Sequence, residues 1–205
     1  MRFSRGRDGA HPLDAAAADA DSPVELKRRR RVVGATAVVG AGVLGASLSS
    51  KPGSARFYVL TGATALTWTV GGLAAGPLRR GSTPGHAAHR GSPRRPVVGP
   101  ILAGVGAFGA FYAGALVAKR IPLLERAISS VLRYADHGSG GLVLLTTLTN
   151  GAAEEVFFRG ALFAAAGPTP RRAAVASTAG YVLATTATRN PALVLASGVM
   201  GALFA

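Results

Sequence analysis

Cysteine is absent from the 205-residue sequence. The chain therefore forms no disulfide bond, holds no zinc through thiolates and uses no thiol nucleophile. Acidic residues are few, nine against 23 lysines and arginines, so the formal net charge is +14. Aromatic residues make up only 6% of the sequence, and the aromatic platforms on which RNA-binding modules stack bases are missing. The shortage of aromatic residues argues against a nucleic-acid-binding protein despite the basic charge.

Basic residues lie mainly at the edges of apolar segments, at positions 27–31, 79–80, 94–95 and 119–120. Charges placed there anchor membrane helices and set their orientation. Apolar residues make up 49% of the sequence, and its mean hydropathy is +0.33. This composition is typical of a polytopic membrane protein. We therefore predict an all-α membrane helix bundle, because a helix satisfies its own backbone hydrogen bonds in lipid.

About five to six transmembrane helices are expected, since about 20 apolar residues cross the roughly 30 Å of hydrocarbon. The first apolar segment is interpreted as a retained helix, because it and the polar region before it are long for a secretory signal. The segments lie at 32–50, 57–78, 97–118, 142–166, 173–188 and 192–205. The glycines of the third segment would allow close packing against other helices; they are Gly104, Gly106, Gly109 and Gly114.

The chain divides into four regions. Residues 1–31 are polar and predict a disordered basic cytoplasmic tail. Residues 32–118 hold three helices with a basic loop, and residues 119–141 form an amphipathic connection. Residues 142–205 form a final core, which we expect to be incomplete because its last apolar run reaches the C-terminus without a polar anchor. The positive-inside rule places the N-terminus on the cytoplasmic side. The high content of arginine, alanine and glycine indicates a bacterial protein, so we expect a bacterial plasma membrane.

The stretch NGAAEEVFFRG, residues 150–160, places charged side chains inside an apolar segment. Such residues persist where they face a protein interior or a wet cavity. Glu155 and Arg159 are four residues apart, in the order that favours an ion pair on a helix. Glu154 is rotated by about 100° from Glu155 and has no cation one turn further on. One glutamate is therefore paired, and its neighbour is not.

An unpaired carboxyl group in a poorly hydrated site is suited to general-base catalysis. Glu154 is the candidate to take a proton from a water molecule that attacks a peptide carbonyl, with Glu155 and Arg159 as its partners. Asn150 lies one turn earlier and either bonds Glu154 or its water, or caps a kink with Gly151. The alternative is a purely structural ion pair between helices.

The wording EEVFFRG resembles the Glu-Glu-x-x-x-Arg signature of the type II CAAX prenyl endopeptidase and bacteriocin-processing (CPBP or Abi) family of intramembrane proteases. The resemblance runs from about residue 142 to the C-terminus. It implies a helical intramembrane endopeptidase in which Glu154 activates water and Glu155 and Arg159 assist. It also implies a cavity between the fourth, fifth and sixth helices. Members of the family are metal-dependent or glutamate-dependent, so a divalent metal such as zinc is a candidate cofactor.

The sequence departs from the family pattern on the next helix, where a Phe-x-x-x-His motif is matched by YVLAT, residues 181–185. Tyr181 replaces the phenylalanine and Thr185 replaces the histidine. We assign both, with Asn150, to positioning of substrate or water, because threonine forms hydrogen bonds but is a poor base and a poor metal ligand. None of the four histidines follows the glutamates; they are His11, His86, His89 and His137.

Three interpretations follow. The first is an intramembrane endopeptidase that hydrolyses peptide bonds of a membrane-associated or peptide substrate, with membrane lipid as its surroundings and no nucleic acid partner. The second is a catalytically impaired or truncated member of the same family that acts as a membrane binding or regulatory protein. The third, a transporter with Glu154 as a proton site, lacks a second charged helix and a visible inverted repeat.

Overall fold

The structure is a computed structural model that describes residues 21–77 and 98–204. Within these residues it contains helices and no strand, which confirms the all-α prediction. The helices are α2 (Pro23–Leu48), α3 (Ala55–Ala74), α4 (Val98–Ala118), α5 (Pro122–Asp136), α6 (Gly140–Glu154), the π-helix η1 (Glu155–Leu162), α7 (Phe163–Ala165), α8 (Pro170–Thr186) and α9 (Pro191–Phe204).

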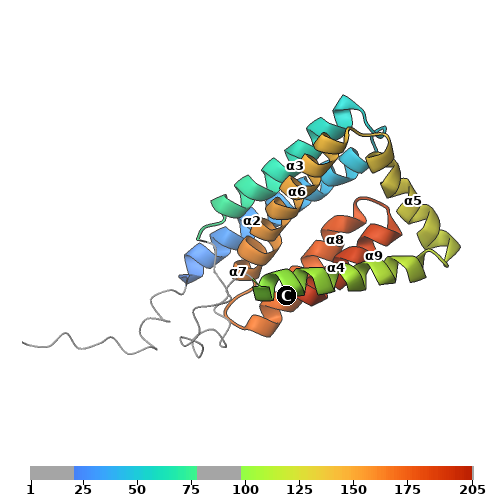
Figure 1. The fold of residues 1–205 in the computed structure, drawn as a ribbon. Coiled ribbons are helices and arrows are strands. Elements are labelled where there is room, and N and C mark those ends of the chain that lie inside the picture. Colours follow the sequence, from blue (N-terminus) through green and yellow to red (C-terminus); the bar gives the residue numbers. More distant parts are fainter. Residues whose placement is uncertain (1–20, 78–97, 205) are drawn as a thin grey trace, which may run out of the picture.

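The helices form two arms that diverge from one end of the molecule (Figure 1). In the first arm, α2, α3 and the continuous α6–η1–α7 helix lie side by side. In the second arm, α8 packs against α9, and α4 runs alongside them in this view. The amphipathic connection predicted from the sequence is α5, which spans the far end and joins α4 to α6 (Figure 1).

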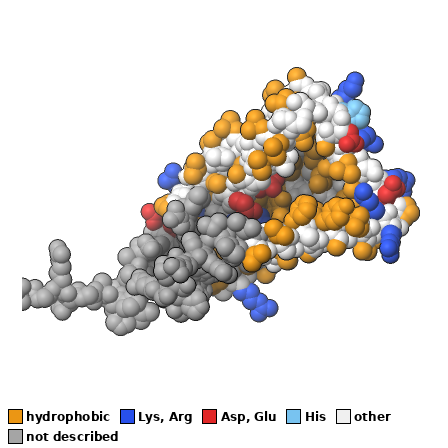
Figure 2. Space-filling model, viewed as in Figure 1, with side chains coloured by type: hydrophobic (Ala, Val, Ile, Leu, Met, Phe, Trp, Pro, Cys, Tyr) orange, Lys and Arg blue, Asp and Glu red, His pale blue; other side chains and the backbone are white. Residues whose placement is uncertain are grey.

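Two helices in the described part of the chain, α2 and α3, are long and apolar enough to cross a membrane. Shorter apolar helices occur at Gly104–Ala118 and Pro191–Leu203. Apolar side chains cover much of the middle of the surface, and lysines and arginines lie toward its ends (Figure 2). This distribution suits a membrane bundle, and the count of five to six spans stays a prediction.

The first helix begins earlier than the sequence predicted. The Ser22 hydroxyl accepts a hydrogen bond from the Glu25 backbone N–H, and the Glu25 carboxylate accepts one from the Ser22 N–H. This capping box, with Pro23 in the first turn, satisfies backbone donors that a helix start otherwise leaves free. Residues 23–31 are therefore helical and do not belong to a disordered tail.

The core lies where α3 meets η1. Trp68 and Phe157 are fully buried and Phe158 is 1% exposed, with ring centroids 4.7 Å apart for Trp68–Phe157 and 5.1 Å for Trp68–Phe158. Gly40 of α2 lies against the Trp68 ring, so closely that a Cβ there would overlap it. Burial of these large rings supplies much of the packing energy that holds the first arm together.

Helix α4 stands apart from this core. A Cβ added at four glycines of α4, Gly104, Gly106, Gly109 and Gly114, meets nothing within 4 Å among the described residues. No described helix uses the close approach that these glycines would allow. Large side chains of α4 are exposed as well, including Phe108 at 71% and Val105 at 63%.

Candidate active site

Glu154 is the last residue of α6 and lies where α6 passes into the π-helix η1. Ala153, Phe157 and Phe158 of the same helix are buried in the core, whereas Glu154 is partly buried and Glu155 is exposed. The sequence predicted an uninterrupted α-helix here. Instead the backbone of η1 follows the wider i→i+5 pattern, which is found mostly as short segments and frequently at functional sites.

Glu154 opens on a cavity of about 440 Å³ between the two arms. Figure 2 shows a hollow there with apolar side chains and acidic groups at its edge. The cavity lies between the fourth, fifth and sixth apolar segments, as predicted, and α2 and α4 complete its walls. Its lining is Leu44, Leu48, Gly104, Ala107, Phe108, Phe111, Glu154, Tyr181, Thr185, Thr188, Leu193, Ala196, Ser197 and Met200.

Tyr181 of α8 is the direct partner of Glu154. Its hydroxyl donates a hydrogen bond of 2.7 Å to Glu154 Oε2. The Tyr181 ring is held in place on two sides, by Phe158 with ring centroids 4.8 Å apart and by the Arg159 guanidinium 5.1 Å from the ring centroid. Thr185 Oγ1 donates to the Tyr181 backbone carbonyl at 2.8 Å. Tyr181 thus contacts Glu154 directly, and Thr185 supports the Tyr181 backbone and lines the same cavity.

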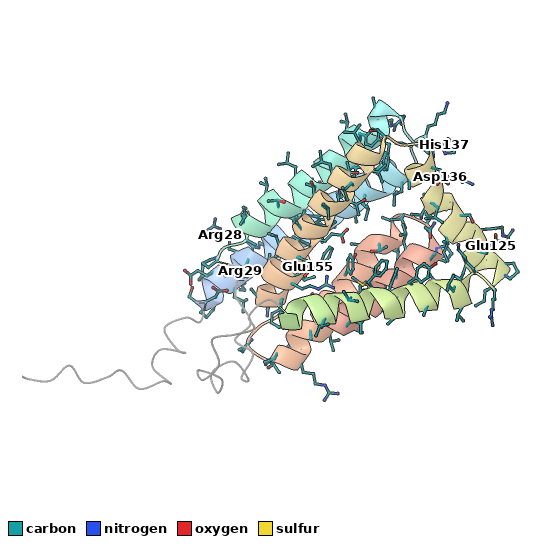
Figure 3. All side chains as sticks on the ribbon, in the orientation of Figure 1. Arg28, Arg29, Glu125, Asp136, His137 and Glu155 are labelled. Carbon is teal, nitrogen blue, oxygen red and sulfur yellow. The ribbon has the colours of Figure 1, made fainter. Side chains whose placement is uncertain are left out.

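The predicted pair of Glu155 and Arg159 is present, with Glu155 Oε1 and Arg159 Nη1 3.6 Å apart. The Glu155 side chain is 56% exposed, so water screens this pair. Figure 3 shows Glu155 at the end of α6, on the side that faces the second arm. Arg159 also donates from Nη2 to the Met200 carbonyl at 3.3 Å, which ties η1 to α9. Its Nε is buried and has no partner among the described residues.

Asn150 does not join this cluster. Its Nδ2 donates to the Thr146 carbonyl at 2.9 Å and to the Thr61 carbonyl at 3.3 Å. The bond to Thr146 lies within α6, and the bond to Thr61 links α6 to α3. The Asn150 amide nitrogen therefore does not bond Glu154 directly, and a role for Asn150 in positioning substrate or water stays a prediction.

The histidines are also remote from the glutamates. His137 follows the end of α5, and its Nδ1 lies 2.9 Å from the Arg133 carbonyl, as a helix-capping residue would. Figure 3 shows it at the far end of the molecule. His11, His86 and His89 lie outside the described residues.

Sequence reasoning missed two polar residues that shape the site. Ser177 is 1% exposed, and its hydroxyl donates to the Phe158 carbonyl at 2.7 Å, within the π-helix. Asn190 immediately precedes α9. Its Oδ1 accepts from the N–H groups of Ala192 and Leu193, and its Nδ2 donates to the Ala127 carbonyl of α5. Neither belongs to a recognisable motif, although the Asn-Pro turn signalled a helix start.

The residues around Glu154 do not fit a zinc ion. Zinc is bound by histidine, cysteine and carboxylate ligands, usually three or four of them. Within the described part of the chain no three such residues come together. The group beside Glu154 is a hydroxyl that donates its proton to the carboxylate, and the Arg159 guanidinium lies over the same ring. A donor hydroxyl and a fixed positive charge disfavour a divalent cation, so the mechanism below contains no step on a metal.

Residues 137–205 match the model of the family described as type II CAAX prenyl endopeptidase Rce1-like. No curated protein and no solved structure matches the chain significantly. The matched segment holds the whole Glu154 cluster, and the match confirms the resemblance that EEVFFRG indicated.

Proposed function

From the match of residues 137–205 to the Rce1-like type II CAAX prenyl endopeptidases, we propose that this chain is a membrane-embedded endopeptidase of that kind. It hydrolyses peptide bonds of a membrane-associated protein or peptide that enters the cavity. The observation that carries the proposal is the position of Glu154, which opens on the cavity with one carboxylate oxygen fixed by Tyr181. We place the chain in a bacterial plasma membrane with its N-terminus in the cytoplasm.

In the proposed reaction Glu154 acts as a general base. Oε2 is occupied by the Tyr181 hydrogen bond, and Oε1 takes a proton from a water molecule in the cavity. The water oxygen bonds to the peptide carbonyl carbon to give a tetrahedral intermediate. As the C–N bond breaks, Glu154 returns the proton to the leaving nitrogen and becomes a carboxylate again. Proton transfer of this type contributes about 10²–10⁴-fold to a rate.

The other members of the cluster position Glu154. The Tyr181 hydroxyl fixes the rotamer of the carboxylate and stabilises its ionised form. Arg159 holds the Tyr181 ring from one side and is itself fixed by Glu155 and by the Met200 carbonyl. Thr185 anchors the backbone of Tyr181. Catalysis then depends on a chain of contacts from α9 through η1 to α8.

A second candidate is a non-catalytic family member that binds a membrane peptide without cutting it. The observation that favours it is Thr185, which replaces the histidine of the family motif and whose hydroxyl is already bonded to the Tyr181 carbonyl. In this reading Glu154 and Tyr181 only recognise the ligand.

The test is cleavage by the full chain reconstituted in lipid vesicles. A mixture of synthetic membrane peptides is incubated with the vesicles, and new peptide termini are identified by mass spectrometry. We expect the natural sequence to cut at least one peptide and Glu154→Gln to lower that rate by about 100-fold or more. The matched control is Glu125→Gln, the same chemical change on α5 at the far end of the molecule (Figure 3), which leaves the rate unchanged.

Tyr181→Phe sharpens the test, because it restores the family residue and removes only the hydroxyl that holds Glu154. We expect kcat to fall by about tenfold, the equivalent of one hydrogen bond, with KM unchanged. Equal rates for the natural sequence and Glu154→Gln would contradict the proposal. Peptide binding without cleavage in both would establish the second candidate.

A further inference from the structure

The basic run at residues 27–31 is divided between two faces of α2. Arg29 is 3% exposed and forms a bidentate pair with Asp21, at 2.7 Å from Nε and 3.0 Å from Nη2. Its Nη1 donates to the Pro77 carbonyl at 3.0 Å. Arg30 Nε donates to the Ala165 carbonyl at 3.0 Å. These two arginines are used inside the molecule, to hold the start of α2 to the ends of α3 and α7.

The other three cations, Lys27, Arg28 and Arg31, face outward. With Val24 and Val32 they line an open cleft of about 470 Å³. Lys27, Arg28, Arg31 and Val32 follow Val24 by three, four, seven and eight residues, which is the spacing of one helical face. In the part of the chain that the structure describes, none of the three forms an ion pair or a side-chain hydrogen bond. Like charges at this spacing repel one another, so the cleft favours an anion.

The same face of α2 is apolar about two helical turns beyond the cations. Val38 and Val39 follow Arg31 by two helical turns and are 75% and 55% exposed. Helix α2 is one of the two helices long and apolar enough to cross a membrane. A ligand for this face therefore needs a negative group beside Lys27, Arg28 and Arg31 and an apolar part along the two valines.

We propose that this face binds an anionic phospholipid. Its phosphate lies in the cleft between the three cations, and its acyl chains lie along Val38 and Val39. Basic residues at the end of a membrane helix attract anionic headgroups in this way. A nucleic acid fits less well, because the described cleft has no aromatic side chain on which a base would stack. The site is separate from the Glu154 cavity, and the inference does not depend on proteolytic activity.

The experiment measures lipid binding to the full chain in mild detergent by native mass spectrometry. Phosphatidylglycerol and phosphatidylcholine of the same acyl composition are titrated in turn. The test variant carries Lys27→Gln, Arg28→Gln and Arg31→Gln. The matched control carries Lys119→Gln, Arg126→Gln and Arg133→Gln, an equal loss of charge at the α5 end of the molecule (Figure 1). Helix content by circular dichroism shows that each variant is folded.

We expect the natural chain and the control to bind phosphatidylglycerol in preference to phosphatidylcholine. The test variant binds phosphatidylglycerol on the order of 100-fold more weakly, from about 1 kcal/mol for each basic residue, and loses the preference. A salt titration tests the natural chain without any substitution. Its preference for phosphatidylglycerol over phosphatidylcholine should fall steeply as the salt concentration rises.

Three results would overturn the proposal. One is equal phosphatidylglycerol binding by the test variant and the natural chain. A second is displacement of the lipid by inorganic phosphate at equal concentration, which would make the cleft a site for free phosphate. A third is retention of a single-stranded RNA by the natural chain but not by the test variant, without any lipid preference.

Discussion

The filled core of the first arm contrasts with the hollow space between the two arms. The first arm is filled at its centre, where Trp68 and the two phenylalanines of η1 have exposures of 1% or less. The space between the arms is hollow, with a cavity of about 440 Å³ covered by a helix, α4, that stands apart. The comparison indicates that tight packing and room for a ligand lie in different parts of the molecule, since a filled core resists change while a hollow admits a ligand.

One helix serves both regions. Phe157 and Phe158 of η1 belong to the filled core, and Glu154, a few residues earlier, opens on the cavity. The core thus fixes the backbone that carries Glu154, as the general-base role proposed for Glu154 requires. Substitutions in the core should therefore act first on stability, and substitutions in the cavity walls on ligand binding.

The largest effect is expected from Trp68→Ala in the filled region. Removing a fully buried aromatic side chain leaves a void that its neighbours fill only in part, and such changes cost about 3–5 kcal/mol. We expect the variant to unfold at a markedly lower temperature in detergent, followed by circular dichroism. Leu66→Ala, on the same helix but 64% exposed, is the control. A similar drop in unfolding temperature for both variants would contradict the conclusion that the first arm has a tightly packed core.

Gly40→Ala tests the same core by overfilling it. A Cβ at Gly40 overlaps the Trp68 ring, whereas one at Gly42 of the same helix meets nothing within 4 Å. We expect Gly40→Ala to destabilise the chain by about 1–3 kcal/mol. Gly42→Ala should be neutral or stabilising by up to about 1 kcal/mol, because alanine favours the helix. Chemical denaturation of the pair in one detergent measures both, and an equal response of the two glycines would exclude tight packing at Gly40.

Tyr134 of α5 tests the contact between α5 and the end of α2. Its hydroxyl donates to the Leu48 carbonyl at 2.6 Å and to the Ser50 carbonyl at 2.8 Å, at the end of α2. Tyr134→Phe should cost about 1 kcal/mol. Burial raises the pKa of Tyr134 above its ordinary value, which is about 10. The contribution of the hydroxyl is therefore fully present below about pH 10 and is lost as pH rises through the higher pKa of the folded state.

Unfolding of the natural chain and Tyr134→Phe is compared between pH 7 and pH 11. The difference in their unfolding free energies should stay constant up to about pH 10 and shrink above it. A difference that grows with pH would have the wrong sign for a group stabilised in its protonated form.

The smallest effect on stability is expected from Phe111→Ala in the wall of the cavity. Phe111 is 38% exposed and lies on α4, so its removal should change the unfolding free energy by less than about 0.5 kcal/mol. If the cavity binds the substrate, the same variant raises KM and leaves kcat unchanged. A loss of stability as large as that of Trp68→Ala would show that α4 packs as tightly as the first arm.

Local features of the site were predictable from the sequence. The helical segments and the pairing of Glu155 with Arg159 were predicted, because both depend on spacing within a few residues. The capping box of Ser22 and Glu25 is equally local and was overlooked, which placed the start of α2 too late. The glycines of α4 would allow close packing, but no described neighbour lies within 4 Å of them, because small residues permit a close approach without supplying the neighbour.

The amino-acid sequence by itself determined that the chain is helical, that its basic residues lie at helix ends, and that two adjacent glutamates occur in an apolar segment. Only the tertiary structure decided that Glu154 meets the Tyr181 hydroxyl, 27 residues further along the chain, and that Arg29 is buried while Arg28 faces outward. The physical reason is the distance along the chain over which each kind of interaction acts. Periodicity fixes which residues share a face of one helix, whereas packing between helices decides what each face meets.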